Sequence, residues 1–215
     1  MKKVKERRVK KMYKQIIFFS IILLIMNCQS QAKIDTKDIS LKGKKILMVI
    51  APEGFRDEEL FVPKKEFEKV SAEVIVASTQ KTNAKGMLGG KFDIKITLNE
   101  IKIDDYVGIV IVGGVGSIDY LWYNEKLHEI VKKFNEQKKV VSAICLSPVV
   151  LAISGVLKGK NATVFITDES KKEFLNNGVK LVNKDIVVDG NIVTANGPRV
   201  AKDFALNIIK LLGNK

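Results

Sequence analysis

The chain has 215 residues and a mass of 24.0 kDa, which suits one domain with an appendage. Apolar residues make up 46% and charged residues 28%, so most of the chain can build a packed core. Two cysteines and one histidine exclude a disulfide scaffold, a Cys/His zinc site and any site that needs two histidines. A Ser-His-Asp triad would have to use His128.

The net charge of +13 is unevenly distributed. Residues 1–14 hold eight Lys or Arg against one Glu, which leaves +6 for the other 201 residues. The remaining lysines are scattered, with no basic face interleaved with aromatic residues of the kind that binds nucleic acid. We therefore expect no nucleic-acid partner.

The basic run leads into an apolar segment, residues 16–26, which is shorter than a bilayer span and has the length of a signal-peptide core. Asn27 and Cys28 follow it. An apolar run that ends at a Cys resembles a bacterial lipoprotein signal, in which that Cys is acylated. Asn27 departs from the Gly, Ala or Ser usual in that motif, and the alternative is an uncleaved anchor in which Cys28 is an ordinary residue.

These features predict three segments. Residues 1–27 form a lipoprotein-type signal peptide, residues 28–42 a polar linker that begins with the lipidated Cys28, and residues 43–215 the folded domain. The domain is then expected outside the cytoplasmic membrane, lipid-anchored to the membrane surface.

Within residues 43–215, apolar runs alternate with helical patterns, which predicts an α/β domain with a mostly parallel sheet. The apolar runs expected to form buried strands are 45–51, 72–78, 108–112 and 140–144. Apolar residues at helical spacing predict helices over 124–137 and 199–212. Weak alternation over 85–99 indicates a small hairpin, and Asp189-Gly190 between two apolar runs predicts a two-residue hairpin turn.

Ligands of such sheets bind at the carboxyl ends of the strands, where Cys145 follows the predicted strand 140–144. Pro148 suits the first turn of a helix, so Cys145 would occupy a strand-turn-helix nucleophile elbow. The field at a helix N-terminus favours an anion, and we expect a lowered pKa for this thiol. The alternative is an ordinary buried cysteine.

Two other strand ends carry candidate groups. Gly113-Gly114 lets backbone N–H groups approach a bound oxygen closely, although a plain tight turn would have the same sequence. Glu59 lies in the first predicted helix, where a solvated acidic helix start is the alternative. The chain has neither a P-loop nor a dinucleotide-binding fingerprint.

Four separated motifs resemble the ThiJ/PfpI superfamily, which includes the Parkinsonism-associated deglycase. They are residues 54–60 with Pro63, Gly113-Gly114, residues 143–148, and residues 194–198 with Phe204-Ala205. The resemblance implies a flavodoxin-like three-layer sandwich of the class I glutamine amidotransferase type, usually assembled as a homodimer.

The resemblance also implies roles for three residues. Cys145 would be the reactive residue, Glu59 a protonated carboxyl that hydrogen-bonds the thiol, and Gly114 an oxyanion contact. A carboxyl that faces a thiolate in a partly buried cleft should have a raised pKa, and the pair should titrate as one unit. No metal or cofactor is needed for this chemistry.

Two positions depart from the superfamily pattern. Leu146 stands where peptidase-like members have a histidine, and Phe165 where the deglycase group has one. His128 points away from the apolar face of its predicted helix, which indicates a solvated surface residue rather than a catalytic base.

These residues are compatible with three alternative functions. The first is an enzyme in which Cys145 attacks a small reactive carbonyl or glycation adduct, with Glu59 moving the proton and Gly114 holding the oxyanion. The second is a non-enzymatic oxidative-stress sensor or chaperone-like protective protein with an oxidisable Cys145. The third, which Leu146 disfavours, is a cysteine peptidase or amidase.

Overall fold

The computed structural model describes residue 36 and residues 38–214. The predicted signal peptide and Cys28 lie outside the described residues. None of the described helices is both long and apolar enough to cross a membrane. Ile39 and Leu41, from the end of the predicted linker, pack against the core, and the Leu41 N–H donates to the Val70 carbonyl at 2.7 Å.

The core of the molecule is a seven-stranded sheet in the order β11-β12-β8-β7-β1-β3-β6. Its strands are β1 (Lys45–Val49), β3 (Glu73–Ser78), β6 (Ile96–Thr97), β7 (Gly108–Ile111), β8 (Val140–Ile144), β11 (Ile186–Asp189) and β12 (Ile192–Ala195). All neighbours are parallel except β11, which runs antiparallel to β12. Every residue of β7 and β8 is buried, as expected for strands covered on both faces.

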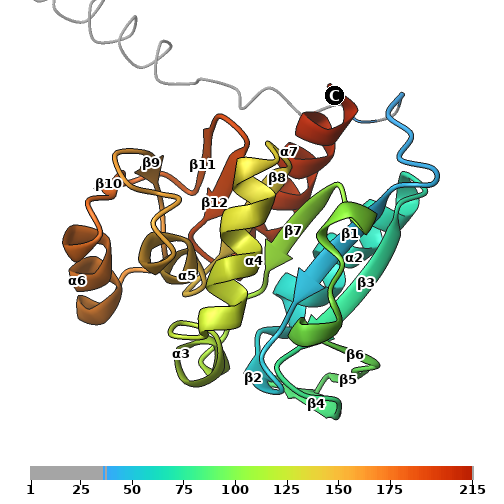
Figure 1. The fold of residues 1–215 in the computed structure, drawn as a ribbon, viewed down its shortest axis with the longest axis horizontal. Coiled ribbons are helices and arrows are strands. Elements are labelled where there is room, and N and C mark those ends of the chain that lie inside the picture. The colour runs from blue at the N-terminus through green and yellow to red at the C-terminus, as the bar shows by residue number, and fades with distance from the viewer. Residues whose placement is uncertain (1–35, 37, 215) are drawn as a thin grey trace, which may run out of the picture. The chain divides into compact units, whose positions relative to one another are not determined.

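Helices cover both faces of this sheet (Figure 1). The helices are α2 (Asp57–Lys69), α3 (Gly116–Tyr120), α4 (Glu125–Glu136), α5 (Pro148–Ile153), α6 (Asp168–Asn176) and α7 (Ala201–Gly213). In Figure 1, α4 lies in front of the sheet, and α2 and α7 pack together behind it. The predicted three-layer sandwich with a mostly parallel sheet is confirmed.

The periodicity of α4 shows how the sequence builds these layers. Its four apolar residues, Leu127, Ile130, Val131 and Phe134, are all buried, and its remaining side chains are not. Asn124 caps the helix, because its side-chain oxygen accepts the Leu127 N–H at 2.9 Å.

Short elements complete the fold. A small sheet joins β2 (Glu53–Phe55), β4 (Asn83–Gly86) and β5 (Lys91–Asp93), and β9 (Asn161–Ala162) pairs with β10 (Lys180–Leu181). The 3₁₀ turns are Leu98–Glu100, Ile103–Asp105 and Pro198–Val200. The hairpin predicted over 85–99 is the antiparallel pair β4-β5, but it begins earlier, at Asn83, and ends at Asp93, because Ile96–Thr97 joins the main sheet as β6.

One predicted turn is shifted by a residue. Asp189 pairs with Ile192 in the β11-β12 hairpin, so the two central residues are Gly190 and Asn191 rather than Asp189 and Gly190. Gly190 has a φ of 65°. The first central residue of a two-residue hairpin turn needs such a positive φ, which strand residues do not adopt, and Gly190 therefore takes that position.

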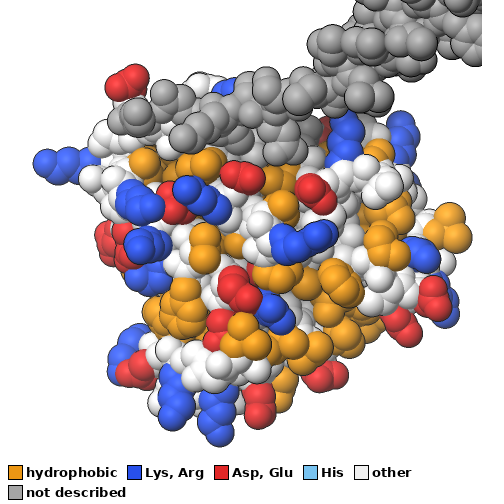
Figure 2. Space-filling view, turned by 180° about the vertical axis from the view of Figure 1, so that it is seen from behind, with side chains coloured by type: hydrophobic (Ala, Val, Ile, Leu, Met, Phe, Trp, Pro, Cys, Tyr) orange, Lys and Arg blue, Asp and Glu red, His pale blue; other side chains and the backbone are white. Residues whose placement is uncertain are grey.

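Figure 2 shows the molecule from behind the view of Figure 1. On this face, Lys and Arg side chains alternate with Asp and Glu, and apolar side chains gather in the lower half. This face therefore carries positive and negative side chains side by side, with no large patch of a single charge.

Candidate active site

Three chain segments meet at the carboxyl edge of the sheet. Cys145 follows β8, Gly113 and Gly114 follow β7, and Glu59 lies in the first turn of α2. A Cβ placed on Gly113 would lie 2.5 Å from the Cys145 Cβ and 2.5 Å from Glu59 Oε2. Cys145 and Glu59 therefore both lie against Gly113, the residue next to the predicted Gly114.

Cys145 has the strained backbone expected of a nucleophile elbow. Its φ is 63°, one of three positive values at non-glycine positions among the described residues. Backbone hydrogen bonds impose this geometry: the Cys145 N–H donates to Ala195 O at 2.9 Å, and Phe165 N–H donates to Cys145 O at 2.7 Å. Pro148 begins α5 three residues later, as the sequence predicts.

Glu59 is fully buried in this site, which excludes the alternative of a solvated helix start. Its Oε2 accepts the Gly113 N–H at 3.0 Å. Its Oε1 has no hydrogen-bond partner of standard geometry among the described residues. The Cys145 thiol is the neighbouring side chain that interacts with this buried carboxyl.

Gly114 cannot be replaced by a larger residue without displacing main chain. Its φ is 104°, and an added Cβ would lie 2.3 Å from Gly54 O and 2.5 Å from Arg56 N. The adjoining Gly113 O accepts the Arg56 N–H at 3.0 Å, which ties the end of β7 to the start of α2. Two backbone N–H groups, those of Gly114 and Leu146, face the Cys145 sulfur and favour its thiolate.

Burial raises the pKa of Glu59 to about 8. Hydrogen bonds with the Cys145 thiol and the Gly113 N–H partly oppose this rise. A carboxyl with this pKa carries a proton at neutral pH, which is the direction of shift expected from the sequence. The prediction of a lowered thiol pKa is wrong: burial raises the pKa of Cys145 to about 12, and an ionised Glu59 adds to the rise. The N–H groups of Gly114 and Leu146 oppose this rise, but desolvation of a nearly inaccessible thiol outweighs them.

Leu146 was not recognised from sequence as a contributor to the site. Its N–H belongs to the residue that follows the nucleophile, and the nucleophile-elbow motif itself assigns an oxyanion contact to that position. The two residues that depart from the superfamily pattern both lie next to Cys145. Leu146 is buried beside the elbow, and Phe165 is half-exposed, with its backbone N–H donating to Cys145 O.

Asp57 has a role that local sequence could not reveal. Its carboxylate accepts the N–H groups of Leu88 at 2.8 Å and Gly90 at 2.6 Å, across more than 30 residues. This clamp holds the β4-β5 hairpin tip against α2, two residues from Glu59.

His128 is half-buried rather than solvated, which corrects the sequence interpretation. Its Nε2 lies 2.8 Å from Trp122 O. Because a carbonyl only accepts, Nε2 carries the proton of this bond. Burial lowers the pKa of His128. Its ring is thus engaged with main chain rather than with the Cys145 thiol.

The described residues contain no group of three or more His, Cys, Asp or Glu that could hold a metal ion. The candidate site brings together a thiol, a carboxyl and main-chain donors.

Comparison with known proteins places the chain in a family. Residues 44–211 match the model of the DJ-1/PfpI family. The chain is 46% identical over 199 residues to an uncharacterized protein of Methanocaldococcus jannaschii, with 93% of this chain and 97% of that protein covered. It is 33% identical over 168 residues to Deglycase PfpI of Pyrococcus furiosus, with 78% and 99% covered.

Solved structures give the same assignment. A ThiJ/PfpI domain protein of Brachyspira murdochii has a TM-score of 0.77 at 33% identity, covering 81% of this chain and 99% of that chain. Drosophila melanogaster DJ-1beta has a TM-score of 0.72 at 27% identity, covering 80% and 92%. The thiol-carboxyl site at the end of a parallel sheet and the match over 44–211 agree that this chain belongs to the DJ-1/PfpI family.

Proposed function

We propose that the chain is a cysteine-dependent enzyme that acts on small reactive carbonyls or glycation adducts through Cys145 and Glu59. The observation that carries the proposal is the buried thiol-carboxyl pair, in which Glu59 Oε1 is unpartnered among the described residues and Gly114 and Leu146 direct N–H groups at the sulfur. Deglycase names among the relatives at about one-third identity support the substrate class.

The position of the proton on the Glu59 carboxyl suits this residue to the role of proton donor and acceptor. Oε2 accepts the Gly113 N–H, so the proton of the neutral carboxyl resides on Oε1. With a pKa of about 8, Glu59 holds that proton at neutral pH and can both donate and recover it. A neutral Glu59 also removes the like charge that raises the pKa of Cys145.

The proposed reaction begins with addition of Cys145 to an aldehyde. The S–H bond breaks and the S–C bond forms, while the C=O bond becomes C–O. The carbonyl oxygen takes the proton of Glu59, and Glu59 recovers the thiol proton, which yields a hemithioacetal. Gly114 and Leu146 N–H groups stabilise the developing oxyanion. For a 2-oxoaldehyde, the former aldehyde hydrogen moves as a proton to the neighbouring ketone carbon through an enediol, and the hemithioacetal hydroxyl proton passes to the ketone oxygen, which gives a hydroxyacyl thioester. Water then hydrolyses the thioester and restores the thiol, so no external oxidant is consumed.

The test is consumption of methylglyoxal by the full chain, beside Cys145→Ser and Glu59→Gln. We expect multiple turnovers for the unmodified protein and a loss of at least about 100-fold in each variant. Matched controls are Cys28→Ser, which removes the other cysteine, and Glu66→Gln, a buried glutamate of α2 that pairs with Lys69 at 2.7 Å.

The second candidate, a protein protected or switched by oxidation of Cys145, is favoured by the same unpartnered Glu59 Oε1, which could donate to a sulfur-bound oxygen. It predicts one oxygen-modified Cys145 per chain under mild peroxide and no methylglyoxal turnover. That result would replace the enzyme proposal.

A further inference from the structure

Trp122 is the single tryptophan of the chain, and it is 2% exposed in the connection between α3 and α4. Its indole Nε1–H donates to Leu146 O at 3.0 Å. Leu146 directly follows Cys145 and directs its N–H at the sulfur. The indole thus restrains one of the two residues that supply main-chain donors to the thiol.

Ser117 makes the equivalent contact with the other donor residue. It is fully buried in α3, and both its N–H, at 3.1 Å, and its Oγ, at 2.8 Å, donate to Gly114 O. Gly114 has a positive φ of 104° at the end of β7, which glycine adopts without strain, and its N–H faces the same sulfur. Two bonds to one carbonyl fix the orientation of this glycine.

The two contacts are joined into one chain of hydrogen bonds. The backbone N–H of Trp122 donates to Ser117 O at 2.9 Å, and the backbone carbonyl of Trp122 accepts a hydrogen bond from His128 Nε2 at 2.8 Å. The path therefore runs from Gly114 through Ser117 and Trp122 to Leu146. It connects the loops after β7 and β8, in addition to the direct bond that Ser147 Oγ donates to Val112 O at 2.7 Å.

We propose that Ser117 and Trp122 are positioning residues that set the separation and direction of the Gly114 and Leu146 N–H groups around Cys145. Neither side chain need touch the substrate, because each acts on the carbonyl of a donor residue. Buried hydrogen-bond networks of this kind restrain geometry, and oxyanion donors lose much of their effect when they are misaligned. This inference deepens the proposed carbonyl chemistry and rests on it for its kinetic readout.

The first test compares two buried serines of the full chain. In Ser117→Ala the Oγ bond to Gly114 O is lost. Ser154→Ala is the matched control, because Ser154 Oγ donates to the carbonyl of Leu151, also three residues earlier, at 2.9 Å and away from Cys145. We expect kcat on methylglyoxal to fall about 10-fold in Ser117→Ala with KM within about twofold, and Ser154→Ala to retain the unmodified kcat.

The second test does not depend on turnover. The rate of Cys145 alkylation by iodoacetamide is followed against pH by mass spectrometry of the Cys145 peptide, which separates it from Cys28. Because the Gly114 and Leu146 N–H groups favour the thiolate, we expect the alkylation profile to move to higher pH in Ser117→Ala and in Trp122→Phe, with rates at pH 8 about 3- to 10-fold lower.

If Trp122→Phe does not fold, the benzothiophene analogue of tryptophan replaces it, since this keeps the bicyclic shape and lacks the N–H. Alkylation profiles of folded Ser117 and Trp122 variants that superimpose on the unmodified protein would overturn the inference. So would an equal shift in Ser154→Ala. Shifted profiles in a protein without methylglyoxal turnover would uphold the positioning role and reject only the proposed reaction.

Discussion

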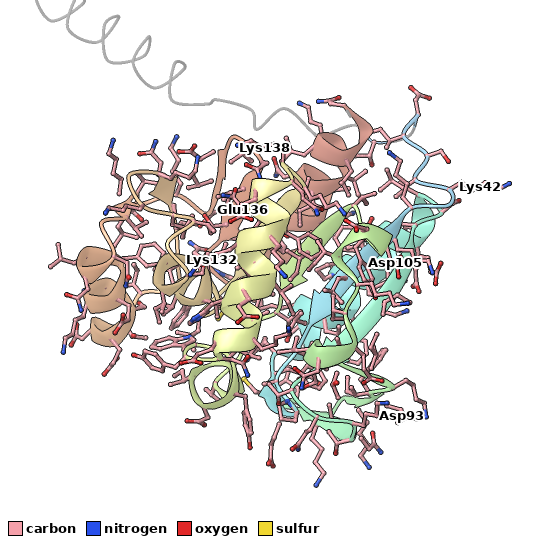
Figure 3. The ribbon with its side chains drawn as sticks, in the orientation of Figure 1. Lys42, Asp93, Asp105, Lys132, Glu136 and Lys138 are labelled. Carbon is pink, nitrogen blue, oxygen red and sulfur yellow. The ribbon has the colours of Figure 1, made fainter. Side chains whose placement is uncertain are left out.

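The two edges of the sheet have very different chemistry. At the carboxyl edge, Cys145 and Glu59 are buried beside strained main chain, and their pKa values are raised. At the amino edge, a cavity of about 390 Å³ is lined by Lys44, Asp104, Tyr106, Val107, Gln137, Lys138, Lys139 and Leu212. Its lysines are half-buried or exposed, and Figure 3 shows Lys138 just beyond α4 at this edge.

The contrast shows that an open cavity with charged walls is a poor guide to reactivity. At the amino edge, Lys139 Nζ donates to Ile103 O at 2.7 Å and Gln137 to Asp104 at 3.1 Å, which are ordinary surface contacts. At the carboxyl edge, desolvation itself changes which groups hold a proton at neutral pH. Four predictions test this difference, from the largest expected effect to the smallest.

Gly114→Ala should have the largest effect on stability. Gly155→Ala is its control, because Gly155 also has a positive φ, 83°, but has no atom within 4 Å of an added Cβ. The control should lose about 1–2 kcal/mol from backbone strain alone. Gly114→Ala should lose at least about 2 kcal/mol more, because its Cβ would collide with Gly54 and Arg56 main chain. Chemical denaturation measures both, and equal losses would contradict the crowding described at this edge.

The stability of the protein should depend on pH through Glu59. Between about pH 5 and pH 8, Glu59 is protonated when folded and ionised when unfolded, so unfolding releases a proton. The contribution of Glu59 to the free energy of unfolding is therefore fully present below about pH 4.5 and is lost as pH rises through 8. Denaturation midpoints measured from pH 5 to 9 should fall more steeply for the unmodified protein than for Glu59→Gln. Parallel curves would show that Glu59 is not buried as described.

Asp57→Asn should weaken the hairpin clamp. An amide keeps one acceptor oxygen and loses the other, so one of the bonds to Leu88 and Gly90 N–H is lost. A charge-assisted bond of this kind contributes about 1.5–3 kcal/mol, and we expect a loss near the lower value. Hydrogen exchange at Leu88 and Gly90 should accelerate more than at β7. Unchanged exchange at the tip would contradict the clamp.

Lys44→Ala at the amino-edge cavity should have the smallest effect. We expect unfolding free energy within about 0.5 kcal/mol of the unmodified protein and methylglyoxal turnover within about twofold, because this side chain is only half-buried, at the wall of an open cavity. A loss comparable to that of Glu59→Gln would mean that the two edges are not separate in function.

Much of this protein could be predicted from local patterns in its sequence. The buried strands, the periodicity of α4 and the elbow at Cys145 depend on neighbouring residues, whose spacing decides which side chains face the core. The meeting of Cys145 and Gly114 follows from the same reasoning, because parallel strands end at one edge, whereas the approach of Glu59 to the thiol was expected only from the family resemblance. The shifted β11-β12 turn shows its limit, since strand register depends on the partner strand.

What only the tertiary structure decided is the environment of each reactive group. A helix N-terminus favours a thiolate locally, yet the layers packed around Cys145 remove water and raise its pKa instead. Likewise, Asp57 finds its partners in a hairpin some 30 residues away, and Trp122 finds Leu146 across two loops. Sequence spacing determines which groups reach the edge of the sheet. Burial and hydrogen-bond partners are properties of the folded chain as a whole, and they determine what those groups can do there.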